Sequence, residues 1–267
     1  MPYVAVCDLI GPLAHFRKFY TNSSSLSYGF PPRTVLMGIV AAVLGWERDA
    51  YYEELGLQRA RFAVVVKVPV RRIVQTVNYI RTKEEDLNRM KKLGAAKGTQ
   101  VPLELLVPAG ESPHLKFRMY FAHQDQELVK EWAARLKARR VHYPLYLGLT
   151  EFIAQARFLY EGEPKAIHLP GEEVAVNSVV NAAFLAKPLL KGDVALNREK
   201  APLSFGPGRQ LLPTASFIYE VASRPVPAIL SCAAYTFSLP DGQETVAFME
   251  GDLWDTTPTR MASAATA

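Results

Sequence analysis

The sequence predicts an α+β fold in which four strands and two helices precede a smaller region made mainly of strands. Apolar, β-branched runs indicate the strands, and helix start and stop signals bound the helices. Proline and glycine recur in the last third of the chain, which is typical of short strands joined by turns. With 267 residues, 49% of them hydrophobic, the chain can bury a sizeable core in one large domain or two small ones. Disordered, collagen-like and disulfide-scaffold proteins are excluded.

The first two predicted elements are a strand and a helix. Residues 3–10 are apolar and β-branched and end at Gly11-Pro12, which indicates a buried strand. Residues 35–44 follow Pro31-Pro32 and end at Gly45, which are a natural helix entry and exit. The chain therefore begins with a strand followed by a helix.

Two further strands and a second helix follow. Residues 61–70 are too rich in valine for an easy helix, and residues 115–121 alternate strictly between two faces. Asp125 can cap a helix over residues 125–140, in which Leu128, Trp132 and Leu136 share one face. Residues 152–160 form the fourth strand. This β-α-β-β-α-β order is the ferredoxin-like arrangement, which RNA-recognition folds share with many unrelated enzymes.

The predicted domains are residues 1–160, with an insertion at residues 71–113, and a small β-rich domain at residues 161–255. Strands are expected in the second domain at residues 174–180, 216–221, 228–239 and 244–249. Pro240-Asp241-Gly242 is a good hairpin turn between the last two. Residues 256–267 are predicted to be a frayed tail.

Positive charge is concentrated in one part of the chain, whose net charge is +5. Residues 67–97 hold nine basic and three acidic residues, whereas residues 201–267 hold three basic and six acidic ones. A local positive field suits an anionic partner such as nucleic acid. The alternative is that these charges form an ordinary solvent-exposed surface without a partner.

Membrane, secretory and metal-binding proteins are not indicated. The longest apolar stretch, residues 35–44, is far too short to cross a bilayer, and residues 1–10 contain Asp8 and no basic segment of a signal peptide. Cys7 and Cys232 lie far apart without metal-ligand spacing. We therefore expect a reduced, cytoplasmic protein without cofactor, metal or membrane contact.

Cations and aromatic rings alternate after the first strand. His15, Arg17, Lys18 and Tyr20 are followed by Tyr28, Arg33 and Thr34. Such interleaving suits single-stranded RNA, because cations meet phosphates and rings stack on bases. The helix that begins near Arg33 also offers free backbone N–H groups to a phosphate. The alternative is that the aromatic residues of this segment pack under the loop.

These residues carry a resemblance to a known family. Gly11-x-x-Ala14-His15-Phe16-Arg17-Lys18 and Ser27-Tyr28-x-Phe30-Pro31-Pro32-Arg33-Thr34, with Gly38 and Gly45 after them, resemble the N-terminal signature of the family-five CRISPR-associated proteins. Thr99-Gln100-Val101-Pro102-Leu103-Glu104 and Tyr143-Pro144-x-Tyr146-Leu147-Gly148-Leu149-Thr150-Glu151 resemble its later blocks, closest to the subtype I-B branch. Members of this family are repeat-associated (RAMP) subunits at the foot of Cascade, the type I RNA-guided surveillance complex. The likeness covers about residues 3–154 and continues weakly through residues 177–180.

The resemblance implies an RNA-recognition-like first domain whose insertion, residues 71–113, forms a thumb that grips the 5-prime handle of the guide RNA. It also implies a backbone filament subunit and a large subunit as neighbours, and it allows indirect contact with target DNA. The third strand lacks the aromatic, glycine-rich motif with which RNA-recognition domains stack bases on their sheet. We therefore expect RNA binding through loops and the thumb.

One branch of this family cuts the repeat RNA itself, which leaves a nuclease as an alternative. Metal-free cleavage would need a base such as His15, assisted by Lys18, Tyr20 or Tyr28. The other histidines show no paired ligand spacing. The turn at residues 206–209 is not a phosphate-binding loop, because it lacks the terminal Lys and Ser/Thr pair, but it can present Arg209 to RNA.

The sequence thus favours a non-catalytic RNA-binding and assembly subunit that clamps the guide and joins the large subunit to the filament. The alternatives are a metal-independent endoribonuclease on the same fold and an unrelated small-molecule enzyme. The predicted RNA contacts are His15, Arg17, Lys18, Tyr28, Arg33, Thr34, Arg71, Arg72, Arg81, Lys83, Lys91, Lys92, Lys97 and Arg209.

Overall fold

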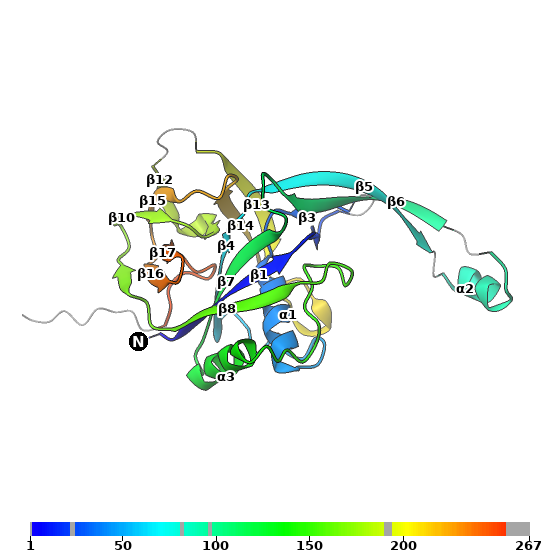
Figure 1. Cartoon of the computed structure of the whole chain (residues 1–267), viewed down its shortest axis with the longest axis horizontal. Helices are drawn as coiled ribbons and strands as arrows, with labels where there is room; N and C mark the ends of the chain where they lie inside the picture. The colour runs from blue at the N-terminus through cyan, green and yellow to red at the C-terminus, as the bar shows by residue number, and fades with distance from the viewer. Residues whose placement is uncertain (1, 22–24, 81–82, 96–97, 190–193, 255–267) are drawn as a thin grey trace, which may run out of the picture.

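A computed structural model describes residues 2–21, 25–80, 83–95, 98–189 and 194–254. The predicted contacts Arg81 and Lys97 and the predicted tail, residues 256–267, lie outside these ranges. The chain forms a mixed α/β structure with several small sheets (Figure 1). No helix within the described ranges is long and apolar enough to cross a bilayer.

The largest sheet has four antiparallel strands in the order β4-β7-β1-β8. Its strands are β1 (Val4–Gly11), β4 (Ala60–Val66), β7 (Leu115–His123) and β8 (Gln155–Gly162). The register places Met119 of β7 between Cys7 of β1 and Val64 of β4. All four strands predicted for the first part of the chain are therefore present and pair with one another.

Two helices pack on one face of this sheet. They are α1 (Arg33–Leu44), which ends at Gly45 with φ 81°, and α3 (Gln126–Lys137). Asp125 caps α3 as predicted, because its carboxylate accepts from the backbone N–H of Glu127 at 3.0 Å. Trp132 and Leu136 of α3 lie in the core between helix and sheet.

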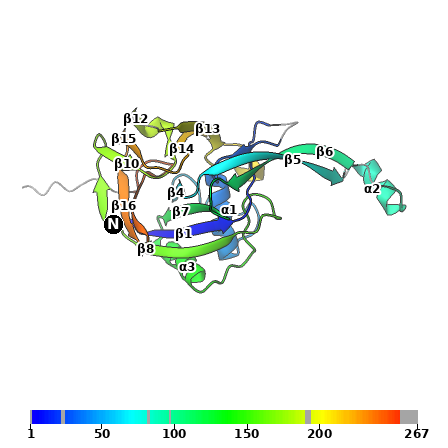
Figure 2. The same ribbon diagram turned by 45° about the horizontal axis from the view of Figure 1, so that its top comes forward.

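The thumb is a long two-stranded ribbon with a helix at its far end (Figures 1 and 2). It consists of β5 (Val70–Ile80), α2 (Glu84–Lys91) and β6 (Gly98–Pro108), with Val70 paired to Pro108 and Ile80 to Gly98. Most side chains of β5 are exposed, because the ribbon projects away from the body of the molecule.

The C-terminal part contains three three-stranded sheets with the orders β10-β15-β12, β11-β14-β13 and β17-β16-β9. Its strands are β9 (Ala166–His168), β10 (Glu173–Val176), β11 (Val180–Asn181), β12 (Leu185–Pro188), β13 (Leu196–Pro202), β14 (Thr214–Glu220), β15 (Val226–Leu230), β16 (Ala234–Leu239) and β17 (Gly242–Val246). Short 3-10 turns lie at Ala182–Phe184 and Pro207–Arg209.

The predicted hairpin turn between the last strands is confirmed, because Leu239 pairs with Gly242. The prediction of one strand over residues 228–239 is wrong. The chain leaves β15 at Leu230 and resumes as β16 in a different sheet, and the Ser231 N–H donates to the carbonyl of Phe184 at 2.8 Å instead of continuing a ladder.

Both faces of β1, β4 and β7 are buried, whereas the edge strand β8 is half-exposed. On the face opposite the helices, Val4, Val6 and Tyr120 pack against Phe237 and Val246 of the β16–β17 hairpin. The same interface holds the fully buried Arg118, whose guanidinium pairs with Asp8 at 2.8 Å, Asp241 at 2.7 Å and Glu244 at 2.8 Å. Over the described residues of β1, β4 and β7, the β16–β17 hairpin therefore covers the face on which bases could otherwise stack.

Candidate nucleic-acid interface

The segment that follows β1 lies against the base of the thumb. Its short strands β2 (Phe16–Arg17) and β3 (Ser27–Tyr28) pair with each other. Ala14 exchanges two backbone hydrogen bonds with Leu106 of β6, at 3.1 and 2.8 Å. The structure thus brings together the two regions in which the sequence predicted RNA contacts.

His15 is buried in the junction between the β2–β3 segment and the base of the thumb. Its Nδ1 donates to the carbonyl oxygen of Glu104 at 2.8 Å, and its Nε2 accepts from the Ser25 hydroxyl at 3.0 Å. In the neutral ring the proton therefore lies on Nδ1. Burial lowers the pKa of His15, and the neighbouring Arg17 lowers it further. Because both ring nitrogens are occupied and the side chain is buried, His15 has no free nitrogen to act as a base on RNA in this arrangement.

The lowered pKa of His15 gives a pH dependence of stability with a definite sign. The unfolded chain takes up a proton on His15 below about pH 6.5, whereas the folded chain resists protonation, so folding stability falls as the pH drops below that value. The loss is at most about 1.4 kcal/mol per pH unit. We expect urea unfolding to show a steeper fall between pH 7 and pH 5.5 for the wild type than for His15→Asn.

The four other histidines are common to both proteins, so the difference isolates His15. Equal pH dependence in the two proteins would contradict the buried, neutral state of this ring.

The other candidate nuclease residues are arranged for packing and binding. The Tyr28 hydroxyl donates to the backbone carbonyl of Lys200 at 2.9 Å, and burial raises the pKa of Tyr28. The Nζ of Lys18 lies 3.5 Å from Glu199 and 5.8 Å above the Tyr28 ring. Tyr20 is exposed and its ring meets Phe19 edge-on. Lys18 and Tyr28 therefore lie together, but the Tyr28 hydroxyl and both nitrogens of His15 already have partners.

The prediction that Arg33 contacts RNA needs correction, because its side chain is fully buried. The guanidinium pairs with Glu250 and donates to the carbonyls of Leu55 at 2.9 Å, Ala60 at 3.1 Å and Leu203 at 3.0 Å. Residues 30–33 are all buried, so the start of α1 is also not open to a phosphate. Arg33 ties α1 to the C-terminal part.

Among the described cations of the thumb, Arg72 is held by polar contacts, whereas several others are exposed. Arg72, at the base, donates to Glu199 at 2.5 Å and to the Tyr219 hydroxyl at 3.3 Å. Arg71 on the opposite face of the ribbon is exposed, and so are Lys83, Lys91 and Lys92 at the two ends of α2. On the body, Arg17 is exposed and donates to the Thr21 carbonyl at 3.4 Å. The exposed set, Arg17, Arg71, Lys83, Lys91 and Lys92, is the candidate interface.

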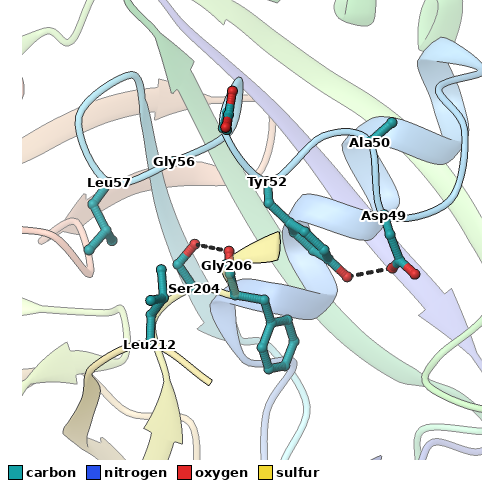
Figure 3. A pocket seen from close by; sticks show the side chains of 10 residues that line it. Asp49, Ala50, Tyr52, Gly56, Leu57, Ser204, Gly206 and Leu212 are labelled. Carbon is teal, nitrogen blue, oxygen red and sulfur yellow. Dashed lines mark hydrogen bonds between the residues drawn. The ribbon is translucent and has the colours of Figure 1, made fainter. Parts of the chain in front are cut away.

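Arg209 and Thr34 lie elsewhere, in the wall of the second of two neighbouring hollows. The first, about 530 Å³, lies between residues 49–57 and 204–212, and the Tyr52 hydroxyl donates to Asp49 at its edge at 2.6 Å (Figure 3). The second, about 870 Å³, is lined by Thr34, by Arg209 and by the rings of Trp46, Tyr51, Tyr52, Tyr143, Tyr146 and Phe205. Arg209 pairs with Asp49, which lines the first hollow, at 2.9 Å. The sequence did not predict these hollows, because their walls come from segments that are far apart in the chain.

The sequence patterns also did not predict the roles of two acidic side chains in this junction, Glu104 and Glu199. Glu104 accepts from the Ser27 N–H at 2.7 Å, and Glu199 accepts from the Gly29 N–H at 2.9 Å. Glu104 falls in a block that resembles the family, but no local pattern marks Glu199 or Tyr219. Only their three-dimensional neighbours reveal what they do.

Comparisons with known proteins identify similar solved structures and one protein family. A crystal structure of a CRISPR protein from Archaeoglobus fulgidus has the same fold, with a TM-score of 0.56 at 12% identity, and the match covers 91% of this chain and 99% of that chain. A chain of a CRISPR RNA-guided surveillance complex is similar at 16% identity and a TM-score of 0.45, covering 84% of this chain and 91% of that chain. No curated protein matches. The model of the family described as CRISPR-associated protein (Cas_Cas5) matches residues 6–184, about two thirds of the sequence, and the chain belongs to this family.

Proposed function

We propose that the chain is a non-catalytic subunit of a type I CRISPR effector complex that binds the 5-prime handle of the guide RNA. The observation that carries this proposal is the exposed basic thumb, which leaves the body beside the exposed Arg17. Family membership supports the same role. Arg17, Arg71, Lys83, Lys91 and Lys92 supply the charge for phosphates, and the exposed rings of Phe19, Tyr20 and Tyr79 supply surfaces for bases.

The arrangement of the sheet is consistent with this mode of binding. The order β4-β7-β1-β8 with α1 and α3 on one face fits a ferredoxin-like first domain at residues 1–160, followed by a β-rich domain at residues 161–255. RNA-recognition domains bind on the face opposite their helices, and here the β16–β17 hairpin covers that face. RNA is therefore directed to the thumb and the β2–β3 segment.

The assembly role rests on surfaces that the chain does not cover itself. Ile80, Leu87 and Leu93 are large apolar side chains exposed near the far end of the thumb. Exposed apolar groups on a projecting element fit a protein neighbour. We assign this end of the thumb to contact with the backbone filament, and the body to contact with the large subunit, which are the two neighbours that the family resemblance implies.

Catalysis by the isolated chain is disfavoured by the site itself. A metal-free ribonuclease needs a base with a free lone pair near the reacting hydroxyl. His15 has both nitrogens occupied by Glu104 and Ser25, and the Tyr28 hydroxyl is held by the Lys200 carbonyl.

Co-expression with the neighbouring genes of its operon tests the proposal. We expect the chain to copurify with the other subunits and with a guide RNA whose 5-prime end is protected from nuclease. Purified alone and mixed with repeat RNA in a chelator, the chain should bind the RNA and leave it intact. Cleavage that His15→Ala abolishes would establish the nuclease instead, and a complex that contains the chain but no RNA would refute guide binding.

A further inference from the structure

Three chain segments converge on one buried carboxylate at the base of the thumb. Glu199 lies on β13, in the C-terminal part, and its side chain is 4% exposed. It accepts from Arg72 of the thumb at 2.5 Å, from the backbone N–H of Gly29 at 2.9 Å and from Lys18 at 3.5 Å. One side chain thus joins the thumb, the β2–β3 segment and the C-terminal sheets.

The surroundings of Glu199 strengthen this junction. Arg72 also donates to the Tyr219 hydroxyl, and it lies 3.8 Å from Glu104, which holds the Ser27 N–H. The Tyr219 hydroxyl accepts in turn from Asn197 of β13 at 3.0 Å. Gly29 packs so closely on Tyr219 that a Cβ there would lie 2.1 Å from the hydroxyl oxygen. The base of the thumb is therefore fixed by polar contacts to side chains of β13 and β14.

We infer that Glu199 is a positioning residue, which acts through Arg72 to set the direction in which the thumb leaves the body. This inference rests on the proposed RNA-binding function. Binding is tighter when the groups that meet a ligand are held in place beforehand, because less order has to be created on binding. A fixed thumb keeps Lys83, Lys91 and Lys92 at a constant position relative to Arg17.

A direct RNA contact is a poorer account of these residues. Glu199 is buried and negatively charged, so it offers nothing to a phosphate. Arg72 and Lys18 are 32% and 15% exposed and share the Glu199 carboxylate, which already satisfies part of their charge. The two cations therefore serve the junction, and the exposed cations farther along the thumb meet the RNA.

The direction of the thumb can be measured without RNA. Spin labels on Asn78→Cys, in the exposed part of β5, and Ile153→Cys, 68% exposed on the body, report the distance between thumb and body. Cys7 and Cys232 are buried and burial raises the pKa of both thiols, so the engineered cysteines label selectively. We expect one narrow distance distribution for the wild type, a broadened one for Glu199→Ala and for Arg72→Ala, and a width nearer the wild type for Glu199→Gln, which retains an acceptor. A narrow distribution in both alanine variants would overturn the inference.

RNA affinity then separates positioning from contact. Glu199→Ala and Arg72→Ala should each weaken binding of a handle RNA by about fivefold or more, and the double variant should be no weaker than either single variant. Glu173→Ala removes the same charge from an exposed position of β10 and should leave affinity unchanged. If Glu199→Ala bound the RNA more tightly than the wild type, Glu199 would only mask the charges of Arg72 and Lys18, and the inference would be wrong. Additive losses, with a shallower salt dependence for Arg72→Ala, would show that Arg72 contacts RNA itself.

Failure of this inference and failure of the proposed function are distinguishable. A wild-type chain that binds no RNA refutes the function, whereas the spin-label distances still decide whether Glu199 positions the thumb. Arg72→Ala removes the partner of Glu199 at the half-exposed base of the thumb. The spin-label distances of this variant therefore remain decisive if the Glu199→Ala protein does not fold.

Discussion

Replacing Arg33 with Gln is expected to destabilise the protein by about 3–5 kcal/mol, because it leaves Glu250 as an uncompensated buried charge. Four backbone carbonyls, those of Leu55, Gly56, Ala60 and Leu203, each lose a donor at the same time, and the guanidinium no longer covers the Phe62 ring, from which it lies 5.0 Å. For a chain of this size, each kcal/mol corresponds to roughly 2–4 °C in Tm. Thermal unfolding should therefore show a fall in Tm of about 10 °C.

Two variants control this measurement. Arg17→Gln makes the same substitution at an exposed arginine and should change Tm little. The double variant Arg33→Gln/Glu250→Gln removes the unpaired charge and should recover part of the loss, as expected when two groups act as a pair. An Arg33→Gln protein as stable as Arg17→Gln would refute the structural role of Arg33.

Reversing the exposed charges of the thumb should have the largest effect on RNA binding. The variant carries Arg71→Glu, Lys83→Glu, Lys91→Glu and Lys92→Glu. Each cation that neutralises a phosphate of a single strand contributes about 0.7 to the slope of log affinity against log salt. Four lost contacts should therefore flatten the slope by roughly 3 and, near 0.1 M salt, weaken binding by 100-fold or more. Folding stability should change little, because exposed cations contribute little to it.

The matched control reverses four exposed cations outside the thumb, Arg139, Arg140, Lys165 and Lys187. It makes the same change in net charge, so a general electrostatic effect would weaken RNA binding equally in both variants. We expect the control to keep most of its affinity and its salt slope, as measured by fluorescence anisotropy. Equal loss in both variants would contradict a specific role of the thumb.

Local sequence patterns predicted most elements of the first 160 residues because their signals lie within a few residues. The cap at Asp125 and the exit at Gly45 are such signals, and α3 and α1 begin and end beside them. The strands of the thumb were not assigned, because among the described strands β5 pairs with β6 alone, and neither strand has a buried face along its whole length to impose alternation. Residues 228–239 are apolar on both sides of the break, so no pattern showed that β15 and β16 belong to different sheets.

The candidate site was predicted by residue type but only partly by role. Arg33 stands in a segment rich in cations and rings, yet its partner Glu250 is 217 residues away in the sequence. His15 and Tyr28 have the residue types of a nuclease, but Glu104, Ser25 and Lys200 occupy their polar atoms. The exposed cations Arg17, Arg71, Lys83, Lys91 and Lys92 remain predicted contacts. Burial and long-range partners, which the sequence does not encode locally, separate these cations from Arg33 and Arg72.

Binding of the wild-type chain to a single-stranded handle RNA, measured over a series of salt concentrations, tests the central claim most directly. With about four to seven cations engaged, the account predicts that log affinity falls against log salt with a slope of roughly −3 to −5, and that the RNA is recovered intact. A slope near zero would contradict the account, because a partner held by the thumb and Arg17 must release counterions when it binds.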